Sequence, residues 1–271
     1  MTTALQSLYR CAALLVVVLS LSHQSRANSQ AMGTIRKVDA DKVRVILVGD
    51  STMATRTGYG DALCARFVAA VECINLARGG RSSKSFRVEG LWGNVQKILA
   101  DNKASDQPRT TYVLIQFGHN DQPGKAERST DLATEFPVNI ARYVDEVQSA
   151  GGVPILVTPL TRRTFRNGVL HNDLIPWADV TRRIAKEKSV AVIDLNAKSA
   201  LAVAQMGTAE ADTHAEEPPP PFPAYAAGSM GDPTKPESNT AVKSRFDYTH
   251  LGAKGAALFS RMVARELADV T

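Results

Sequence analysis

Ser51 follows directly after a short apolar run and is the first residue of chemical interest. The run reads VRVILVG over Val43–Gly49, a β-branched and apolar pattern that is typical of a buried strand. A serine hydroxyl is a weak nucleophile near neutral pH and needs a neighbouring base. Ser51 is therefore a candidate nucleophile for acyl transfer if the fold brings a base and an oxyanion site to it.

The chain has 5 histidines from which such a base can come. His23 lies in an apolar N-terminal segment, His214 in a Pro-rich segment and His171 in a polar stretch. His119 and His250 remain, and each lies in a short polar motif, GHND and DYTH. The search for a base therefore reduces to these two residues.

His250 is favoured because Asp247 precedes it by three residues. A carboxylate at this spacing folds back within one turn and accepts a hydrogen bond from imidazole Nδ1. Nε2 is then left to take the serine proton, as in a Ser-His-Asp triad. The alternative is that Asp247 or Thr249 caps a helix and that His250 is a solvated residue of its first turn.

An acyl-transfer site also needs N–H donors for the oxyanion. The backbone N–H groups of Ser51 and Gly80 and the side-chain amide of Asn120 are the candidates. Glycine at position 80 tolerates the unusual dihedral angles that such a loop requires. Taken singly, Gly80 and Asn120 are also ordinary turn residues.

The polar neighbours of these residues are expected to be structural. Asp50 and Thr52 are expected to hydrogen-bond the turn around Ser51, and Asp121 to brace the loop of Asn120. His119 is expected to bind neighbouring backbone.

Substrate contacts are expected from basic and aromatic side chains near the motifs. The candidates are Arg81, Lys84, Arg162, Arg163 and Trp177. Arginine and lysine can bind carboxylates such as uronate groups, and the indole ring can stack on a sugar. The alternatives are solvated charges for the basic residues and core packing for the tryptophan.

Strands and helices alternate along the chain, which predicts an α/β fold with a parallel sheet covered on both faces. Strands are expected at 43–49, 72–77, 111–118, 153–159 and 190–195. Helices are expected at 61–71, 91–101, 131–152, with Pro137 perturbing it, 173–189 and 253–270. Because ligands bind beyond the carboxyl ends of parallel strands, Ser51 and Asn120 are expected at one shared site.

Four ordered blocks of the chain resemble those of the SGNH (GDSL-type) hydrolases. They are GDST at 49–52, GGRSSKSF at 79–86, GHND at 118–121 and DYTH at 247–250. The stretches GDSTMA, ARGGRSS, FGHND and TPLTRRTF more narrowly resemble the rhamnogalacturonan acetylesterases, carbohydrate esterase family 12. The likeness extends over roughly 43–270.

The resemblance implies a three-layer α/β/α flavodoxin-like fold with a five-stranded parallel sheet. It implies Ser51 as nucleophile, Asp247 and His250 as orienter and base, and an oxyanion hole of Ser51, Gly80 and Asn120. No cofactor and no metal is expected. A metallophosphoesterase would need several His and Asp ligands, and few credible histidines are left for that role.

Composition and the termini limit the class and location of the protein. The chain has 271 residues, 44% hydrophobic content and a formal charge of +5, values of a globular protein without a nucleic-acid-binding run. Residues 1–29 resemble a secretory signal peptide, with an uncleaved anchor as the alternative. We expect one domain over 30–271, no other membrane segment, and a secreted or periplasmic protein. A Pro-rich loop insertion is expected at about 205–241.

Cys64 and Cys73 form an even pair in an oxidising compartment. A disulfide between them and two small buried thiols are both compatible with the sequence. Which of the two holds stays open at this level.

The hypothesis from the sequence is a secreted serine esterase that removes O-acetyl groups from a plant-type polysaccharide such as rhamnogalacturonan or pectin. The alternatives are a lipase, lysophospholipase or thioesterase of the same superfamily, and a non-catalytic polysaccharide-binding protein. An acetylated polysaccharide or oligosaccharide is the expected partner. A monomer is expected, although the sequence leaves the oligomeric state open.

Overall fold

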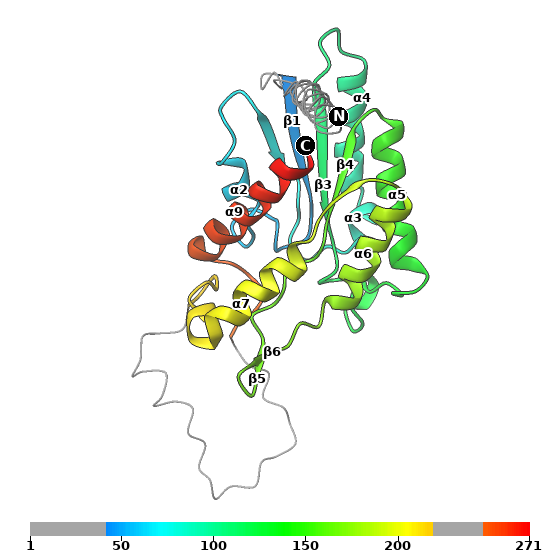
Figure 1. The fold of residues 1–271 in the computed structure, drawn as a ribbon. Coiled ribbons are helices and arrows are strands. Elements are labelled where there is room, and N and C mark those ends of the chain that lie inside the picture. Colours follow the sequence, from blue (N-terminus) through cyan, green and yellow to red (C-terminus); the bar gives the residue numbers. More distant parts are fainter. Residues whose placement is uncertain (1–41, 219–245) are drawn as a thin grey trace, which may run out of the picture. The chain divides into compact units, whose positions relative to one another are not determined.

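Five parallel strands form the central sheet of the protein (Figure 1). The structure is a computed structural model that describes residues 42–218 and 246–271. The strands are ordered β2-β1-β3-β4-β7 and every neighbouring pair is parallel, which confirms the expected sheet. Their bounds are β1 Val43–Gly49, β2 Glu72–Asn75, β3 Thr110–Gln116, β4 Val153–Val157 and β7 Ala191–Ile193.

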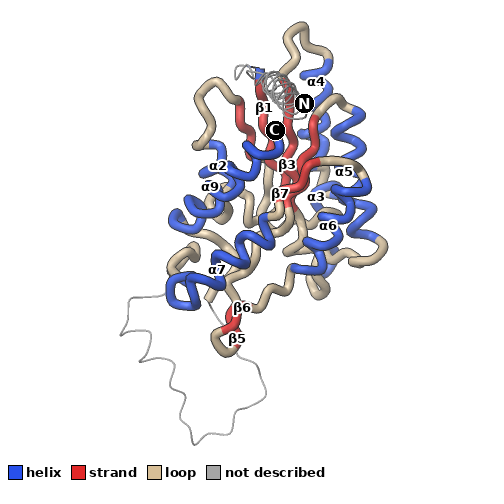
Figure 2. Tube along the Cα trace, in the orientation of Figure 1, coloured by secondary structure: helices blue, strands red, loops and turns tan. Residues whose placement is uncertain are grey.

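Helices cover both faces of this sheet (Figure 2). One face carries α2 (Gly60–Cys64), α7 (Leu195–Asp212) and α9 (Ala253–Val270), and the other carries α4 (Leu91–Lys103), α5 (Glu135–Ser149) and α6 (Ile175–Glu187). Smaller elements are α3 (Ser85–Val88), the 3-10 helix η2 (Ala126–Arg128) and the antiparallel hairpin of β5 (Phe165–Arg166) and β6 (Val169–Leu170). The expected three-layer α/β/α arrangement is therefore confirmed.

Alternation along β1 shows why the strand is apolar from Val45 to Val48. Val45 and Leu47 pack into the core beneath α2, α7 and α9. Ile46 and Val48 pack into the core beneath α4, α5 and α6. Successive strand side chains point to opposite faces, so a strand with both faces covered reads as a continuous hydrophobic run. The polar residues that follow β1 are thereby left at the carboxyl edge of the sheet.

Pro137 does not disturb a helix interior, contrary to the expectation. Helix α5 begins at Glu135, so Pro137 lies in its first turn. The backbone N–H groups of a first turn have no intrahelical partner, and proline therefore sacrifices no helical hydrogen bond there. The helix ends at Ser149, shortly before Gly151, whose φ is +81°.

Helix α2 ends at Cys64, much earlier than the expected limit at position 71. A disulfide joins Cys64 to Cys73, whose Cα atoms lie 5.4 Å apart. A helix continued to Val71 would carry the chain about 10 Å along its axis. Two further residues, which span at most about 7 Å, would then have to reverse direction at once to reach Cys64, so the early end of the helix makes the disulfide easier to close.

Helix α7 was not expected and overlaps the start of the Pro-rich segment. It runs to Asp212, so the expected loop is wrong for residues 205–212. The Asp194 carboxylate caps it by accepting from Ala197 N at 3.4 Å. The expected signal segment at 1–29 and most of the expected loop lie outside the described residues. Over the described ranges, no helix combines the length and apolarity needed to cross a bilayer.

Replacing Cys64 and Cys73 by alanine is expected to lower the free energy of unfolding. Closing a loop of this short length removes about 2–3 kcal/mol of chain entropy from the unfolded state. Urea denaturation of wild type and Cys64→Ala/Cys73→Ala, with and without reductant, measures the change. Reductant should affect only the wild type, and equal stability of all four samples would contradict the prediction.

Candidate active site

Ser51 lies in a tight turn directly after β1 and is 7% exposed. The Asp50 carboxylate accepts from the backbone N–H and the hydroxyl of Thr52, at 2.9 and 2.8 Å. Gln116, the last residue of β3, donates to Thr52 Oγ1 at 2.6 Å and accepts from the Tyr59 hydroxyl at 2.6 Å. The expectation that Asp50 and Thr52 hydrogen-bond the turn is confirmed. Such a buried and satisfied polar network fixes one conformation of the turn.

The Asp50 carboxylate also faces the ring of His119, whose Nδ1 lies 3.2 Å from Asp50 Oδ2. Burial opposes the negative charge most strongly. The charge and hydrogen bond of His119 and the donors of Thr52 outweigh it, and the pKa of Asp50 lies below its ordinary value. This pair ties the turn after β1 to the loop after β3. His119 thus has a structural role, although its partner is a side chain and not the expected backbone.

The loop after β2 approaches Ser51 closely. A Cβ placed on Gly79 would lie 3.8 Å from Ser51 Cβ, and Gly80 has a φ of +77°, which favours glycine. Asn120 donates from its side-chain amide to the Arg81 carbonyl at 3.1 Å. An amide nitrogen carries two hydrogens, so one remains for another acceptor. The three expected oxyanion donors therefore belong to adjoining loops.

Asp247 and His250 form the hydrogen-bonded pair that their spacing predicts. Nδ1 of His250 lies 2.5 Å from Asp247 Oδ2, and Asp247 Oδ1 accepts from the backbone N–H groups of Thr249 and His250 at 2.8 and 3.0 Å. Burial opposes ionisation of Asp247, but these donors outweigh it and lower its pKa. The His250 side chain is 31% exposed. Since Nδ1 is engaged, Nε2 is the nitrogen left for a substrate or nucleophile.

Thr57 connects the nucleophile turn to the histidine segment. Its hydroxyl donates to the Ser51 carbonyl at 2.8 Å, and its own carbonyl accepts from Leu251 N at 2.9 Å. Among the described residues, Ser51 Oγ and His250 Nε2 make no direct hydrogen bond. In serine hydrolases such contacts commonly tighten only when substrate binds. The catalytic roles of the two residues are therefore part of the proposal below.

Arg163 holds the turn that carries the acid–base pair. Its Nη2 donates to the carbonyls of Asp247 and His250, both at 2.8 Å, and its backbone N–H donates to the Tyr248 carbonyl at 2.9 Å. Burial lowers the pKa of Arg163 to about 10, opposed by the charges of Asp247 and Asp212. An arginine that donates hydrogen bonds to three carbonyls of one turn fixes the position of that turn. The stretch TPLTRRTF contains Arg163, but nothing in the sequence pattern indicated that its side chain would bind the turn at 247–250.

Two residues expected to contact substrate are buried instead. Arg163 is 1% exposed and directs its guanidinium to the 247–250 backbone, so the expectation that it binds a substrate carboxylate is wrong. Trp177 is 8% exposed and packs in the core beneath α4, α5 and α6, so it does not offer a face for a sugar ring. The alternative of core packing holds for this tryptophan.

The other three expected substrate contacts are already paired. Arg81, Lys84 and Arg162 contact the carboxylates of Glu89 at 2.7 Å, Glu135 at 3.1 Å and Asp173 at 2.7 Å, respectively. Arg162 also donates to Thr249 Oγ1 at 3.2 Å, next to His250. A substrate carboxylate would have to compete with these partners.

Asp121 braces the Asn120 loop, as expected. Its carboxylate accepts from the backbone N–H and hydroxyl of Ser83, with the shortest contact at 2.6 Å, and from the Thr130 hydroxyl at 3.1 Å. Desolvation by burial dominates over these donors and raises the pKa of Asp121 to about 7. The loops after β2 and β3 are thereby joined through a carboxyl group that titrates near neutral pH.

Glu216 is a further acidic residue beside the acid–base pair. One side-chain ligand atom each from Glu216, Asp247 and His250 lie within 4.8 Å of one another, the one such grouping over the described ranges. The 2.5 Å hydrogen bond between Asp247 and His250 already uses one atom of each residue. We therefore interpret this group as the surroundings of a base and not as a metal centre.

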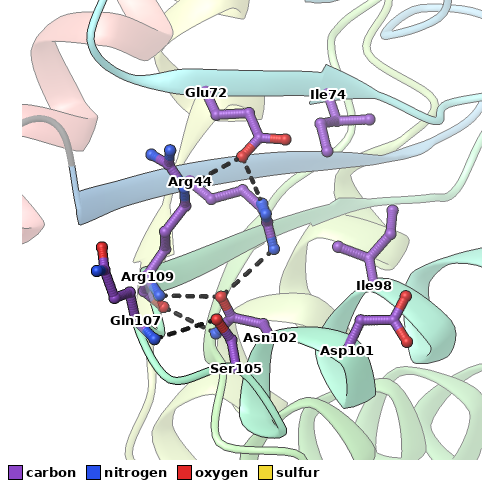
Figure 3. Close-up of a pocket in the computed structure, with 9 residues that line it drawn as sticks. All are labelled: Arg44, Glu72, Ile74, Ile98, Asp101, Asn102, Ser105, Gln107 and Arg109. Atoms are coloured by element: carbon purple, nitrogen blue, oxygen red, sulfur yellow. Dashed lines mark hydrogen bonds and ion pairs between the residues drawn. The ribbon is translucent and has the colours of Figure 1, made fainter.

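A polar hollow of about 280 Å³ lies at the opposite end of the strands (Figure 3). Arg44 bridges Glu72 Oε2 at 2.9 Å and Asn102 Oδ1 at 3.4 Å there, and Asn102 also bonds the backbone of Arg109. Hydrogen bonds thus link Arg44, Glu72 and Asn102 within this hollow. They are far from the carboxyl edge and are interpreted as a structural network.

Comparison with known proteins matches most of the chain to one family. The model of the GDSL-like lipase/acylhydrolase family matches residues 47–258. The probable rhamnogalacturonan acetylesterase YesY of Bacillus subtilis (strain 168) is 30% identical over 233 residues, 83% of this chain and 93% of YesY. Rhamnogalacturonan acetylesterase RhgT of the same organism is 30% identical over 237 residues, 84% of this chain and 90% of RhgT.

Solved structures share the fold at lower identity. The YXIM protein of Bacillus subtilis matches with a TM-score of 0.59 at 21% identity. The match covers 84% of this chain and 56% of the YXIM chain. A variant of the acetylxylan esterase Axe2 from Geobacillus stearothermophilus matches with a TM-score of 0.54 at 16% identity, over 83% of this chain and 94% of that one. These likenesses support the α/β/α architecture.

Arg163→Met is expected to reduce kcat for p-nitrophenyl acetate by about 10- to 100-fold, because the unclamped turn misplaces His250. Arg163→Lys, which keeps a charged donor, is expected to lose less. Steady-state kinetics are measured at a temperature at which circular dichroism shows that both variants are folded. This separates the role of Arg163 in placing His250 from its contribution to global stability. A folded methionine variant with wild-type kcat would contradict this prediction.

Asp121→Asn is expected to change how stability depends on pH. Because the folded pKa is about 7 and the ordinary value is 3.8, the unfolded state releases this proton first as pH rises. The unfolding free energy of the wild type should then fall relative to the variant by about 1.4 kcal/mol per pH unit between about pH 4 and pH 7. It should stay level above that range.

Urea denaturation of wild type and Asp121→Asn at several pH values in this range measures the difference. A constant offset between the two proteins from acid to neutral pH would mean that Asp121 does not titrate there.

Proposed function

This chain belongs to the GDSL-like lipase/acylhydrolase family, and from that premise we propose that it is a secreted serine esterase acting on O-acetyl groups of a plant-type polysaccharide. Rhamnogalacturonan is the favoured polymer, because two relatives over most of the chain, YesY and RhgT, are named rhamnogalacturonan acetylesterases. As a member of this family it is a carboxylic ester hydrolase.

The observation that carries the proposal is the Asp247–His250 pair beside the Ser51 turn. Nδ1 of His250 is held at 2.5 Å from the Asp247 carboxylate, which leaves Nε2 as the proton acceptor. Thr57 joins the two segments by hydrogen bonds to the Ser51 carbonyl and from Leu251 N. A neutral imidazole oriented in this way is what a serine nucleophile requires.

In the first half-reaction, Ser51 Oγ attacks the acetyl carbonyl while His250 Nε2 takes the hydroxyl proton. The oxyanion forms against the N–H groups of Ser51, Gly80 and Asn120. The bond from the acetyl carbon to the sugar oxygen then breaks. His250 returns its proton to that oxygen, the sugar alcohol leaves, and acetyl-Ser51 remains.

In the second half-reaction, water replaces the sugar alcohol. His250 accepts a proton from water, and the hydroxide equivalent attacks the acetyl carbonyl of acetyl-Ser51. The ester bond to Ser51 breaks, and its oxygen recovers the proton from His250. Acetate is released, and the negative charge of Asp247 stabilises the transient imidazolium in both halves.

Export is part of the proposal and has two supports. Residues 1–29 have the pattern of a secretory signal, with an apolar run followed by small residues. The Cys64–Cys73 disulfide fits an oxidising compartment. A mature protein that begins between 28 and 32 after expression in an exporting host is the expected result of N-terminal sequencing.

Ser51→Ala is expected to lose about 10⁶ in kcat, the scale seen when a serine triad loses its nucleophile. The assays are p-nitrophenyl acetate hydrolysis and acetate release from acetylated rhamnogalacturonan, acetylated xylan and acetylated galacturonan. Ser105→Ala, at the opposite end of the strands (Figure 3), is the matched control and should keep wild-type rates.

The same assays separate the rival functions. An acetylesterase should lose activity steeply along a series of p-nitrophenyl esters beyond short acyl chains, whereas a lipase or thioesterase should gain it. Binding of the polymers without any release of acetate would favour a polysaccharide-binding protein. Near-native turnover by Ser51→Ala would remove Ser51 from the mechanism.

A further inference from the structure

We propose that the hollow between the loops after β1 and β2 is a subsite for a uronate unit of the substrate, with Arg56 and Arg78 as its carboxylate-binding groups. This inference rests on the proposed esterase function. It assigns to two arginines a role that the sequence pattern had suggested for others. The anionic sugar unit would lie next to the unit whose acetyl ester is cleaved.

The hollow adjoins the candidate nucleophile. Its volume is about 530 Å³, and Thr57 and Gly79 both line it. A Cβ on Gly79 would lie 3.8 Å from Ser51 Cβ, and the Thr57 hydroxyl binds the Ser51 carbonyl at 2.8 Å. Ligand pockets commonly have volumes of about 300–1,000 Å³. The hollow therefore has the size and place of a sugar subsite beside Ser51.

Two exposed cations line this hollow. Within the described part of the chain, the guanidinium groups of Arg56 and Arg78 have no hydrogen-bond or ion-pair partner, in contrast to Arg81 and Arg162. Guanidinium groups bind carboxylates through two parallel N–H bonds and are weakly hydrated. A carboxylate ligand would therefore meet donors that no side chain already occupies.

The backbone holds both arginines in place. Arg78 N donates to the Gly49 carbonyl at 2.9 Å, which anchors it to the end of β1. Arg56 has a φ of +70°, a conformation that non-glycine residues adopt at a cost. Hydrogen bonds from Thr57 N to the Thr55 carbonyl at 3.0 Å and from Gly58 N to the Ala54 carbonyl at 3.0 Å flank it. Retained strain next to a site is a common sign of pre-organisation.

The rest of the lining suits a sugar that carries one carboxylate. It contains no acidic residue, and Asn94 and Leu91 add an amide group and an apolar surface. Asp61 is the acid bonded to this wall, and its Oδ1 is engaged by Asn75 at 2.7 Å and by Thr55 at 3.3 Å. Asp61 itself is not among the residues that line the hollow.

The test compares esters with and without a uronate. For Arg56→Gln and Arg78→Gln, the ratio of kcat/KM for an O-acetylated oligogalacturonide to that for a neutral O-acetylated xylo-oligosaccharide should fall about tenfold each, as expected for loss of a charged hydrogen bond. The double variant should lose about 100-fold. Arg183→Gln on α6 removes the same charge elsewhere and should keep the wild-type ratio.

Binding provides a readout that does not require hydrolysis. Calorimetry with unacetylated oligogalacturonide should show weaker binding to Arg56→Gln/Arg78→Gln than to wild type or Arg183→Gln, and the difference should shrink in high salt. Equal affinity in all three proteins, or equal kinetic losses on both esters, would overturn the subsite.

Failure of the subsite and failure of the esterase proposal give different results. If Ser51→Ala abolishes hydrolysis of p-nitrophenyl acetate but the arginine variants keep the wild-type ratio and affinity, only the subsite is wrong. If Ser51→Ala retains hydrolysis, the mechanism is wrong, and the calorimetric comparison still decides whether the arginines bind the uronate.

Discussion

The cost of burying a carboxyl group sets the geometry of the loops at the carboxyl edge of the sheet. Asp50 and Asp121 are both fully buried, and their oxygens must find donors because unpaired buried polar groups are expensive. Asp50 takes Thr52 from its own turn and His119 from the loop after β3. Asp121 takes Ser83 from the loop after β2. Three loops from three adjacent strands are thereby locked together around Ser51.

A buried charged side chain also fixes the loop after β4, and here the charge is positive. Arg163, after β4, is buried and its guanidinium donates to the carbonyls of Asp247 and His250. This side chain thereby helps to hold a turn that is far away in sequence, together with the hydrogen bonds between Thr57 and Leu251 and between Arg162 and Thr249. Arg56 and Arg78 are exposed and make no side-chain hydrogen bond or ion pair with other described residues, so they are available to a ligand in a way that Arg163 is not.

Several features of the fold were predictable because they depend on local pattern. The apolar runs of β1 and β3 predict buried strands within two residues of their observed limits. Helix limits were less predictable where a distant contact decides them. Helix α2 ends at Cys64, which a disulfide joins to Cys73. Helix α7 has weak apolar periodicity and is kinked at Gly207, and Val203 and Ala211 on either side of the kink pack on the sheet face shared with α9.

The sequence by itself determined the parallel α/β architecture, the four chemical motifs and the pairing of Asp247 with His250. Those features depend on periodicity and on residues a few positions apart. Only the tertiary structure decided which charged side chains point inward. Arg162 and Arg163 are neighbours of one type, yet one is partly exposed and the other buried. The difference arises from which carbonyls and carboxylates the folded chain brings to each guanidinium, and that depends on contacts more than eighty residues apart.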